Sequence, residues 1–293
     1  MDLPDKIDRQ FSFNQGKNLF YNGILNSLHF SPETLEAIEK SDFLDSGSED
    51  LLIDYLTNRA IQELCRMNQY YTFNKEEQSG LRNIYTDLFT NIKTRKYPID
   101  SIAEQHYSKI LNWFSETNSF AEKIYSSQAE IIESVVCSEY SPELQIEILQ
   151  INMDRITQPV LDIACGKQGN LVLHLRHKGI EAYGFDRFAM DNPFLTNSDW
   201  FEYIFEKDKW GTITSNLGFS NHFKHHHFRN DGNYIGYAKK YMDILNSLKI
   251  GGCFHYAPDL PFVEQYLDKD KYQLNIARIG NYDFKSSIIK RLK

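Results

Sequence analysis

Short apolar runs alternate with stretches of helical hydrophobic spacing in the half of the chain that follows residue 155. The first run, Pro159–Ile163, ends in a turn of small residues, Ala164–Gly166, and helical spacing follows over Leu171–His177. A second short run, Glu181–Phe185, follows, and short strand-like segments continue to alternate with helical spacing along this half of the chain. Buried strands that alternate with helices predict parallel βαβ units.

The first half of the chain has no strand-like alternation. Its apolar residues recur at helical spacing over four stretches: Glu49–Asn68, Gln78–Thr94, Ser101–Ser115 and Phe120–Val136. Ser31 before Pro32 predicts a helix start, with the serine as cap and the proline in the first turn, and Ser141 before Pro142 predicts another. We therefore predict an all-α domain over residues 1–136 and an α/β domain over residues 137–293.

The turn after the first predicted strand has the residue types of a ligand-binding edge. Gly166 lets the backbone approach a ligand without a Cβ in the way, and the helix that follows offers unpaired N–H groups. Asp186 ends the second predicted strand, twenty residues beyond Gly166, where a doubly wound sheet places an acid that binds ribose hydroxyls. Asp162 would repel a pyrophosphate but suits a cationic or amino-acid group. This combination predicts a cofactor that carries a nucleoside.

The second half of the sequence resembles the class I S-adenosylmethionine-dependent methyltransferases. Leu161–Gly166 is similar to the first motif of that family, and Tyr183–Asp186 is similar to its second. Ser198–Trp200 resembles the adenine-edge motif, Gly211–Asn216 the fourth strand with its polar end, and Leu248–Gly252 the turn before the fifth strand. Each motif is weak alone, but the five occur in the order of the family.

The resemblance covers roughly residues 135–293. It implies a Rossmann-like sheet that is parallel and is closed by an antiparallel strand pair, for which Tyr272–Ile279 and Ser286–Leu292 alternate suitably. The fold expected for the whole chain is this α/β sheet preceded by an all-α domain. In families with such a helical extension, the extension acts as a lid and selects the substrate, so we expect residues 1–136 to form a lid or substrate domain.

The resemblance also assigns roles toward S-adenosylmethionine. Four residues of the first motif would border the amino-acid portion of this cofactor: Asp162, Ala164, Cys165 and Gly166. Asp186 would hold the ribose hydroxyls, and Arg187 would flank the adenine. Asp199 would accept a hydrogen bond from the adenine amino group, while the backbone of Trp200 supports the ring. Gln168 stands where the family has a small residue, and Gly169 offers clearance one position later.

The segment before the first strand provides two further candidate contacts. Tyr140 precedes the helix predicted over Pro142–Ile151, and Gln145 lies in its first turns. Either side chain would meet the methionine end of the cofactor. The alternative interpretation is an ordinary packing helix.

Three residues beyond the predicted strand ends are candidates for catalysis. Asn216 ends the fourth strand, at the edge where open α/β sheets bind ligands, and would face the transferred methyl group or the substrate. His222, with an ordinary pKa near 6.5, would act as a general base or orient the substrate. Asp259, in a rigid proline-rich turn, would reach the substrate pocket. His222 and His226 are spaced i, i+4, which also allows a metal site or plain surface histidines; our prediction includes no metal.

Composition restricts the partners. The formal net charge of −8 at pH 7 argues against broad attraction to nucleic acid. No run of eighteen apolar residues and no secretory pattern occur in the sequence, so we expect no membrane span and a cytoplasmic location. Four cysteines without paired spacing fit reduced thiols.

The sequence leaves three functions open. The first is transfer of a methyl group to the oxygen or nitrogen of a small molecule, and the second is methylation of a peptide or protein. The third is a cofactor-binding scaffold without activity. A homodimer is compatible with all three, and the methyl acceptor is not encoded in any motif.

Overall fold

A computed structural model describes residues 3–40, 46–126, 128–132 and 140–293. The chain divides into two compact units, Met1–Cys137 and Ser138–Lys293. The predicted domain boundary between residues 136 and 137 falls in segment 133–139, which lies outside the described residues.

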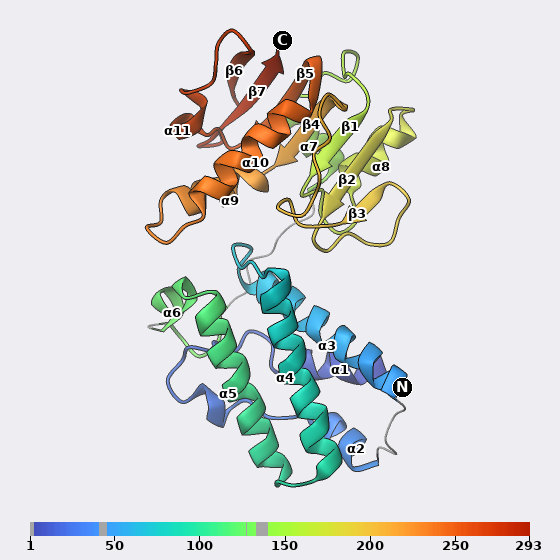
Figure 1. The fold of residues 1–293 in the computed structure, drawn as a ribbon, viewed down its shortest axis with the longest axis vertical. Coiled ribbons are helices and arrows are strands. Elements are labelled where there is room, and N and C mark those ends of the chain that lie inside the picture. Colours follow the sequence, from blue (N-terminus) through green and yellow to red (C-terminus); the bar gives the residue numbers. More distant parts are fainter. Residues whose placement is uncertain (1–2, 41–45, 127, 133–139) are drawn as a thin grey trace. The chain divides into compact units, whose positions relative to one another are not determined.

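The first unit is built from helices: α1 (Leu3–Phe13), a 3₁₀ turn (Ile24–Asn26), α2 (Pro32–Lys40), α3 (Ser46–Met67), α4 (Lys75–Thr94), α5 (Ile99–Thr117) and α6 (Phe120–Tyr125). Helices α3, α4 and α5 pack side by side (Figure 1). The hydroxyl of Ser31 caps α2 by accepting a hydrogen bond from the Thr34 N–H, as the sequence predicts. A capping box between Asn74 and Glu77 begins α4.

The helix predicted over Phe120–Val136 is shorter in the structure, where α6 ends at Tyr125. The Asn18 side-chain amide donates hydrogen bonds to the carbonyls of Tyr125 and Ala129. Ile131 then forms a β-bridge with Lys17. These long-range contacts use backbone groups that a longer helix would need, so tertiary structure overrides the helical spacing; residues 133–136 of the prediction lie outside the described residues.

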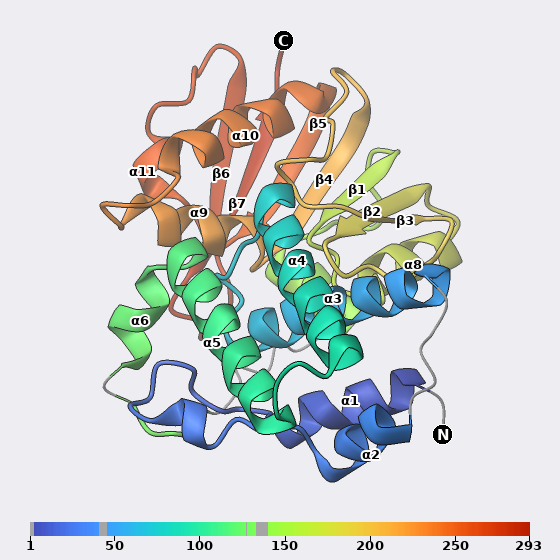
Figure 2. The ribbon, with the colours of Figure 1, turned by 60° about the horizontal axis from the view of Figure 1, so that its bottom comes forward.

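The second unit contains one seven-stranded sheet. Its strands are β1 (Val160–Ile163), β2 (Ala182–Asp186), β3 (Leu195–Asn197), β4 (Trp210–Asn216), β5 (Leu248–Ala257), β6 (Tyr272–Arg278) and β7 (Lys285–Arg291). They lie in the order β3-β2-β1-β4-β5-β7-β6 (Figure 2). Strands β1 to β5 pair in parallel, and β7 runs antiparallel to both β5 and β6. The parallel sheet with a closing antiparallel pair is confirmed.

Two apolar clusters cover the two sides of this sheet. Helices α9 (Phe219–His227) and α10 (Tyr234–Ser247) and the short α11 (Pro261–Glu264) contribute to one cluster. Helices α7 (Pro142–Ile148) and α8 (Asn170–His177) contribute to the other. This is the layered arrangement that parallel strands require, because both of their faces are buried.

Strand β5 begins earlier than predicted. The segment Leu248–Gly252, expected to be a turn, belongs to the strand. The pairing of β4 with β5 shifts register between Trp210 and Thr212. A Cβ at Gly252 would lie 2.8 Å from the Gly211 carbonyl oxygen, so the glycines allow an irregular but continuous strand. No helix within the described part of the chain is long and apolar enough to span a lipid bilayer.

Candidate cofactor and active site

The turn after β1 is joined to the end of β2 through Asp186. The Gly166 N–H donates a hydrogen bond to Asp186 Oδ2 (3.3 Å), and the Phe188 N–H donates to Oδ1 (2.9 Å). Gly166 has a φ of +77°, which favours glycine. Burial raises the pKa of Asp186. The two strand ends therefore hold a carboxylate directly beside the glycine turn, where the twenty-residue spacing predicts it.

Asp162 is a buried carboxyl group on β1. It lies opposite Thr214 in the parallel register, and the Thr214 hydroxyl donates a hydrogen bond to Asp162 Oδ1 (2.7 Å). The other oxygen, Oδ2, has no hydrogen-bond partner among the described residues. Burial, together with the negative charge of Asp186, raises the pKa of Asp162 to about 7. A buried acid with one unpaired oxygen is a suitable partner for a cationic ligand.

In the turn after β1, the side chains of Ala164 and Cys165 pack against neighbouring segments, so the backbone of the turn is what faces the candidate site. Ala164 has a left-handed φ of +57°, and its Cβ would lie 2.6 Å from a Cβ placed on Gly218. Cys165 is buried, and its side chain lies against Gly184 of β2, where an added Cβ would approach its sulfur to 2.9 Å. The Cys165 side chain thus packs beneath the turn, and the Cys165 N–H donates to the Phe185 carbonyl (3.1 Å).

Three predicted site residues, Asp186, Asp199 and His222, lie within electrostatic reach of Arg187. The positive charge of Arg187 opposes the burial that raises the pKa values of Asp186 and Asp199. It also acts on His222, whose ring lies 4.7 Å from the Trp200 ring. Asp199 Oδ1 accepts a hydrogen bond from the Phe201 N–H (2.8 Å), which fixes this carboxyl group in its own turn. The fold thereby gathers residues from three separate motifs.

His222 differs from the expected general base. It is buried in α9, and this burial, with the nearby positive charge of Arg187, lowers its pKa well below the usual value. Desolvation penalises the imidazolium form, so His222 accepts a proton less readily than an ordinary histidine; its role as a general base stays a prediction. His222 is neutral at physiological pH and is a weak proton acceptor.

His226 faces a different environment from His222. Its Nδ1 accepts a hydrogen bond from the Asn233 N–H (3.2 Å), and its ring stacks on Tyr237 with centroids 4.8 Å apart. The described residues include no cluster of three His, Cys, Asp or Glu side chains that could hold a metal ion. The rings of both histidines make packing contacts, His222 with Trp200 and His226 with Tyr237.

Asn216 lies at the carboxyl end of β4, opposite Ala257 of β5 in the register. Neither the oxygen nor the nitrogen of its half-buried amide has a hydrogen-bond partner among the described residues. Leu217 N–H and Ser220 Oγ both donate to the Ala257 carbonyl (2.9 and 2.6 Å), so the surrounding backbone is fixed. A buried amide without partners costs free energy unless a ligand binds it.

The Asp259 side chain serves the connection between β5 and β7. Its Oδ1 accepts a hydrogen bond from the Lys285 N–H (3.3 Å), and its own N–H donates to the Lys285 carbonyl (2.9 Å). These two hydrogen bonds give the Asp259 side chain a structural role that needs no ligand. A substrate contact by Asp259 stays a prediction.

Tyr140 and Gln145 lie at the start of α7. The Gln145 amide nitrogen donates a hydrogen bond to the Tyr140 carbonyl (3.0 Å), and the Ser141 hydroxyl caps the helix. No hydrogen bond among the described residues joins either side chain to the turn after β1. Their contact with the cofactor stays a prediction.

Sequence reasoning missed two residues that support the site. Thr214 bonds the Asp162 carboxyl group, and Ser220 fixes the Ala257 carbonyl beside Asn216. Thr214 lies two positions before Asn216 in a predicted strand, so a known β1–β4 register would have paired it with Asp162. Sequence alone does not provide that register.

Replacing Asp162 with asparagine is expected to change how stability depends on pH. Since the folded pKa of Asp162 is about 7, above its unfolded value, folding takes up a proton between about pH 4 and pH 7. Stability of the ligand-free protein should therefore fall as pH rises through this window, by as much as ~4 kcal/mol from this group. The Asp162→Asn protein should lose that slope in urea unfolding.

The matched control for this measurement is Asp154→Asn, because Asp154 is exposed. The control should keep the wild-type slope. Parallel pH profiles for Asp162→Asn and the wild type would contradict the assignment of a raised pKa to Asp162.

The strand order and the closing antiparallel pair are those that the resemblance to the class I methyltransferases implies. No protein-family model matches the chain, and no curated protein matches it. Among solved structures, an rRNA methylase from Streptococcus thermophilus is similar at 14% identity and a TM-score of 0.36, over 54% of this chain and 100% of that chain. A TehB-like SAM-dependent methyltransferase from Corynebacterium glutamicum is similar at 14% identity and a TM-score of 0.36, over 53% of this chain and 90% of that chain.

Proposed function

We propose that this protein is an S-adenosylmethionine-dependent methyltransferase that acts on an oxygen or nitrogen atom of a small molecule. The observation that carries the proposal is the pair of carboxyl groups, Asp162 and Asp186, at neighbouring strand ends around a glycine turn. Burial raises the pKa of both. S-adenosylmethionine carries a cationic amino group and a sulfonium, and ribose hydroxyls that donate hydrogen bonds. The cationic amino group would compensate the buried charge of a carboxylate, and the ribose hydroxyls would donate hydrogen bonds to one.

The remaining parts of the site fit the same cofactor. Asp186 would accept from the ribose hydroxyls, and Asp162 Oδ2 would accept from the amino group. Asp199 and the backbone at Trp200 would hold the adenine, with Arg187 beside it. The unpaired oxygen of Asp162 is the structural observation that favours this fit.

The bound cofactor supplies an electrophilic methyl group on a good leaving group. The residues of this chain then mainly position the acceptor, because an in-line displacement gains most from proximity and alignment. Asn216, with both amide atoms unpaired, is our candidate for orienting the acceptor atom. His222 is neutral and would serve as a hydrogen-bond partner or as packing for Trp200.

The test is titration of the full chain with S-adenosylmethionine and with S-adenosylhomocysteine by isothermal calorimetry. We expect one site per chain for each compound. Incubation with methyl-labelled cofactor and cell extract, followed by separation of small molecules from proteins, should place the label in a small molecule. Absence of binding would contradict the proposal; binding without label transfer would favour the scaffold, and label in protein would favour a peptide acceptor.

Replacing Asn216 with alanine is expected to lower kcat about 100-fold and to change the cofactor Kd by less than about threefold. The reason is that the amide contacts the acceptor rather than the cofactor. Turnover is measured with the acceptor identified by labelling. Asn230→Ala is the matched control, since Asn230 is exposed, and unchanged turnover in Asn216→Ala would remove this residue from the mechanism.

A further inference from the structure

The helical unit contains a cavity of about 550 Å³ that helices α1 to α5 line together. Most side chains around it are aliphatic or aromatic, and every one of them belongs to residues 3–110. This volume lies within the range of small-molecule sites, ~300–1,000 Å³, which are also mostly apolar with a few polar groups. The space is partly open to solvent, and an apolar lining of this size suits a ligand with an apolar body.

Helix α1 turns its apolar side toward this space. None of its residues is buried, although Leu3, Ile7 and Phe11 recur at helical spacing and all three line the cavity. In an ordinary packing helix such residues would be covered by their neighbours. The partial exposure of this face is therefore exposure to the cavity.

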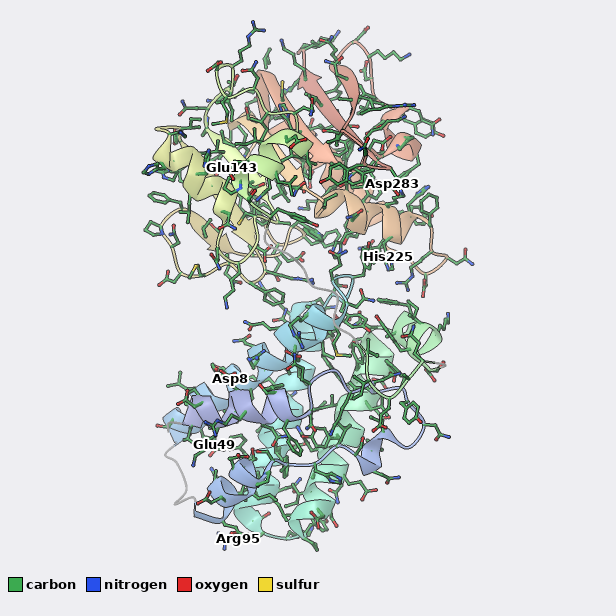
Figure 3. All side chains as sticks on the ribbon, turned by 180° about the vertical axis from the view of Figure 1, so that it is seen from behind. Asp8, Glu49, Arg95, Glu143, His225 and Asp283 are labelled. Atoms are coloured by element: carbon green, nitrogen blue, oxygen red, sulfur yellow. The ribbon has the colours of Figure 1, made fainter. Side chains whose placement is uncertain are left out.

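Polar contacts hold α1 in place despite the open space beneath it. Asp8, labelled in Figure 3, accepts hydrogen bonds from Arg59 Nε (2.7 Å) and from the Tyr55 hydroxyl (3.1 Å) of α3. The Gln10 side chain donates to the His29 carbonyl (3.0 Å) and to the Tyr107 hydroxyl (3.2 Å). Since these bonds fix the distance of α1 from α3 and α5, the helix does not need to collapse into the cavity.

The charges around the cavity are unequal. Its two carboxylates are neutralised: Glu49 pairs with Lys93, and Glu63 pairs with Arg66 (2.5 Å). Lys6 also lines the cavity but has no ion-pair partner among the described residues. A lysine without a counter-charge at the edge of an apolar space favours a ligand with an anionic head and an apolar body.

We propose that the helical unit binds a long-chain carboxylate in this cavity. The chain would lie against Leu52, Leu56 and the apolar face of α1, and the carboxylate would pair with Lys6. The space is several times the ~150 Å³ that accepts one benzene molecule, so a chain of about twelve carbons or more fits. This inference does not depend on methyl transfer.

The test uses the full chain and two probes, dodecanoate and dodecanol, in isothermal calorimetry. We expect dodecanoate to bind one site with a Kd of about 1–10 µM. Lys6→Gln should weaken dodecanoate about fivefold to tenfold and leave dodecanol unchanged, because only the former carries a charge. No binding of dodecanoate up to about 200 µM, or equal weakening of both probes by Lys6→Gln, would overturn the proposal.

Location is tested with a cavity-filling variant and its neighbour. Leu52→Trp should abolish dodecanoate binding because Leu52 lines the cavity. Leu51→Trp should bind like the wild type, since Leu51 is 73% exposed and is not part of the lining. Hydrogen exchange of the wild type gives a second measure that needs no variant: dodecanoate should protect α1. Protection confined to residues 140–293, or binding retained by a folded Leu52→Trp protein, would overturn the proposal.

Discussion

Replacing Asp186 with alanine is expected to weaken S-adenosylmethionine binding about 100-fold, because the variant loses a charge-assisted acceptor for two ribose hydroxyls. It also loses the bonds from Gly166 and Phe188 N–H that hold the glycine turn. The two losses act in the same direction, since a loosened turn also weakens contact with the cofactor. Isothermal calorimetry with S-adenosylmethionine gives the Kd directly.

Two further variants separate these causes. Asp186→Asn retains an oxygen that can accept from one backbone N–H but loses the charge, so it should bind the cofactor with intermediate affinity. Asp191→Ala, an exposed acid five residues later, should bind like the wild type. Wild-type affinity in a folded Asp186→Ala protein would contradict the assignment of the ribose site.

Replacing Glu264 with alanine is expected to lower the free energy of unfolding of the second unit by about 3 kcal/mol. Oε1 of this buried side chain accepts three hydrogen bonds, from the hydroxyls of Tyr256 and Ser287 and from the Leu260 N–H. The bonds join β5, β7 and the start of α11. Alanine removes the acceptor of the Leu260 N–H and the Ser287 hydroxyl, leaves the Tyr256 hydroxyl with Tyr241 alone, and opens a cavity among them. Urea unfolding, followed by tryptophan fluorescence, measures the loss.

Gln265→Ala is the matched control for this variant, because Gln265 is the next residue of the chain and is exposed. It should change the free energy of unfolding by less than ~0.5 kcal/mol. A Glu264→Ala protein as stable as this control would show that the three donors find other partners.

Much of the second unit could be predicted from local pattern. The strand ends, the glycine turn and the acid at position 186 follow from apolar runs and spacing, because a buried parallel strand needs continuous apolar residues on both faces. The closing strand pair was also predictable, since the segments expected over Tyr272–Ile279 and Ser286–Leu292 overlap the observed strands Tyr272–Arg278 and Lys285–Arg291. Helix ends were less predictable, as at Tyr125, where a side chain distant in sequence binds the carbonyls.

The state of the site residues could not be predicted in the same way. Nothing in the sequence distinguishes His222 from an ordinary histidine, whereas burial in the fold, together with the charge of Arg187, lowers its pKa. The hydrogen bond to the Asp162 carboxyl group comes from Thr214, which lies on a strand more than fifty residues away in the sequence. A pKa depends on burial and on neighbouring charges, and both are properties of the assembled fold.

The sequence by itself determined the class of sheet, the glycine turn after β1 and the acid beside it, since each depends on residue types a few positions apart. Only the tertiary structure decided which polar atoms remain without partners at Asp162 and Asn216 among the described residues, and that the helices of the first unit line an apolar cavity. The physical reason is that hydrogen-bond satisfaction and packing depend on which distant segments meet. Spacing along a chain does not contain that information.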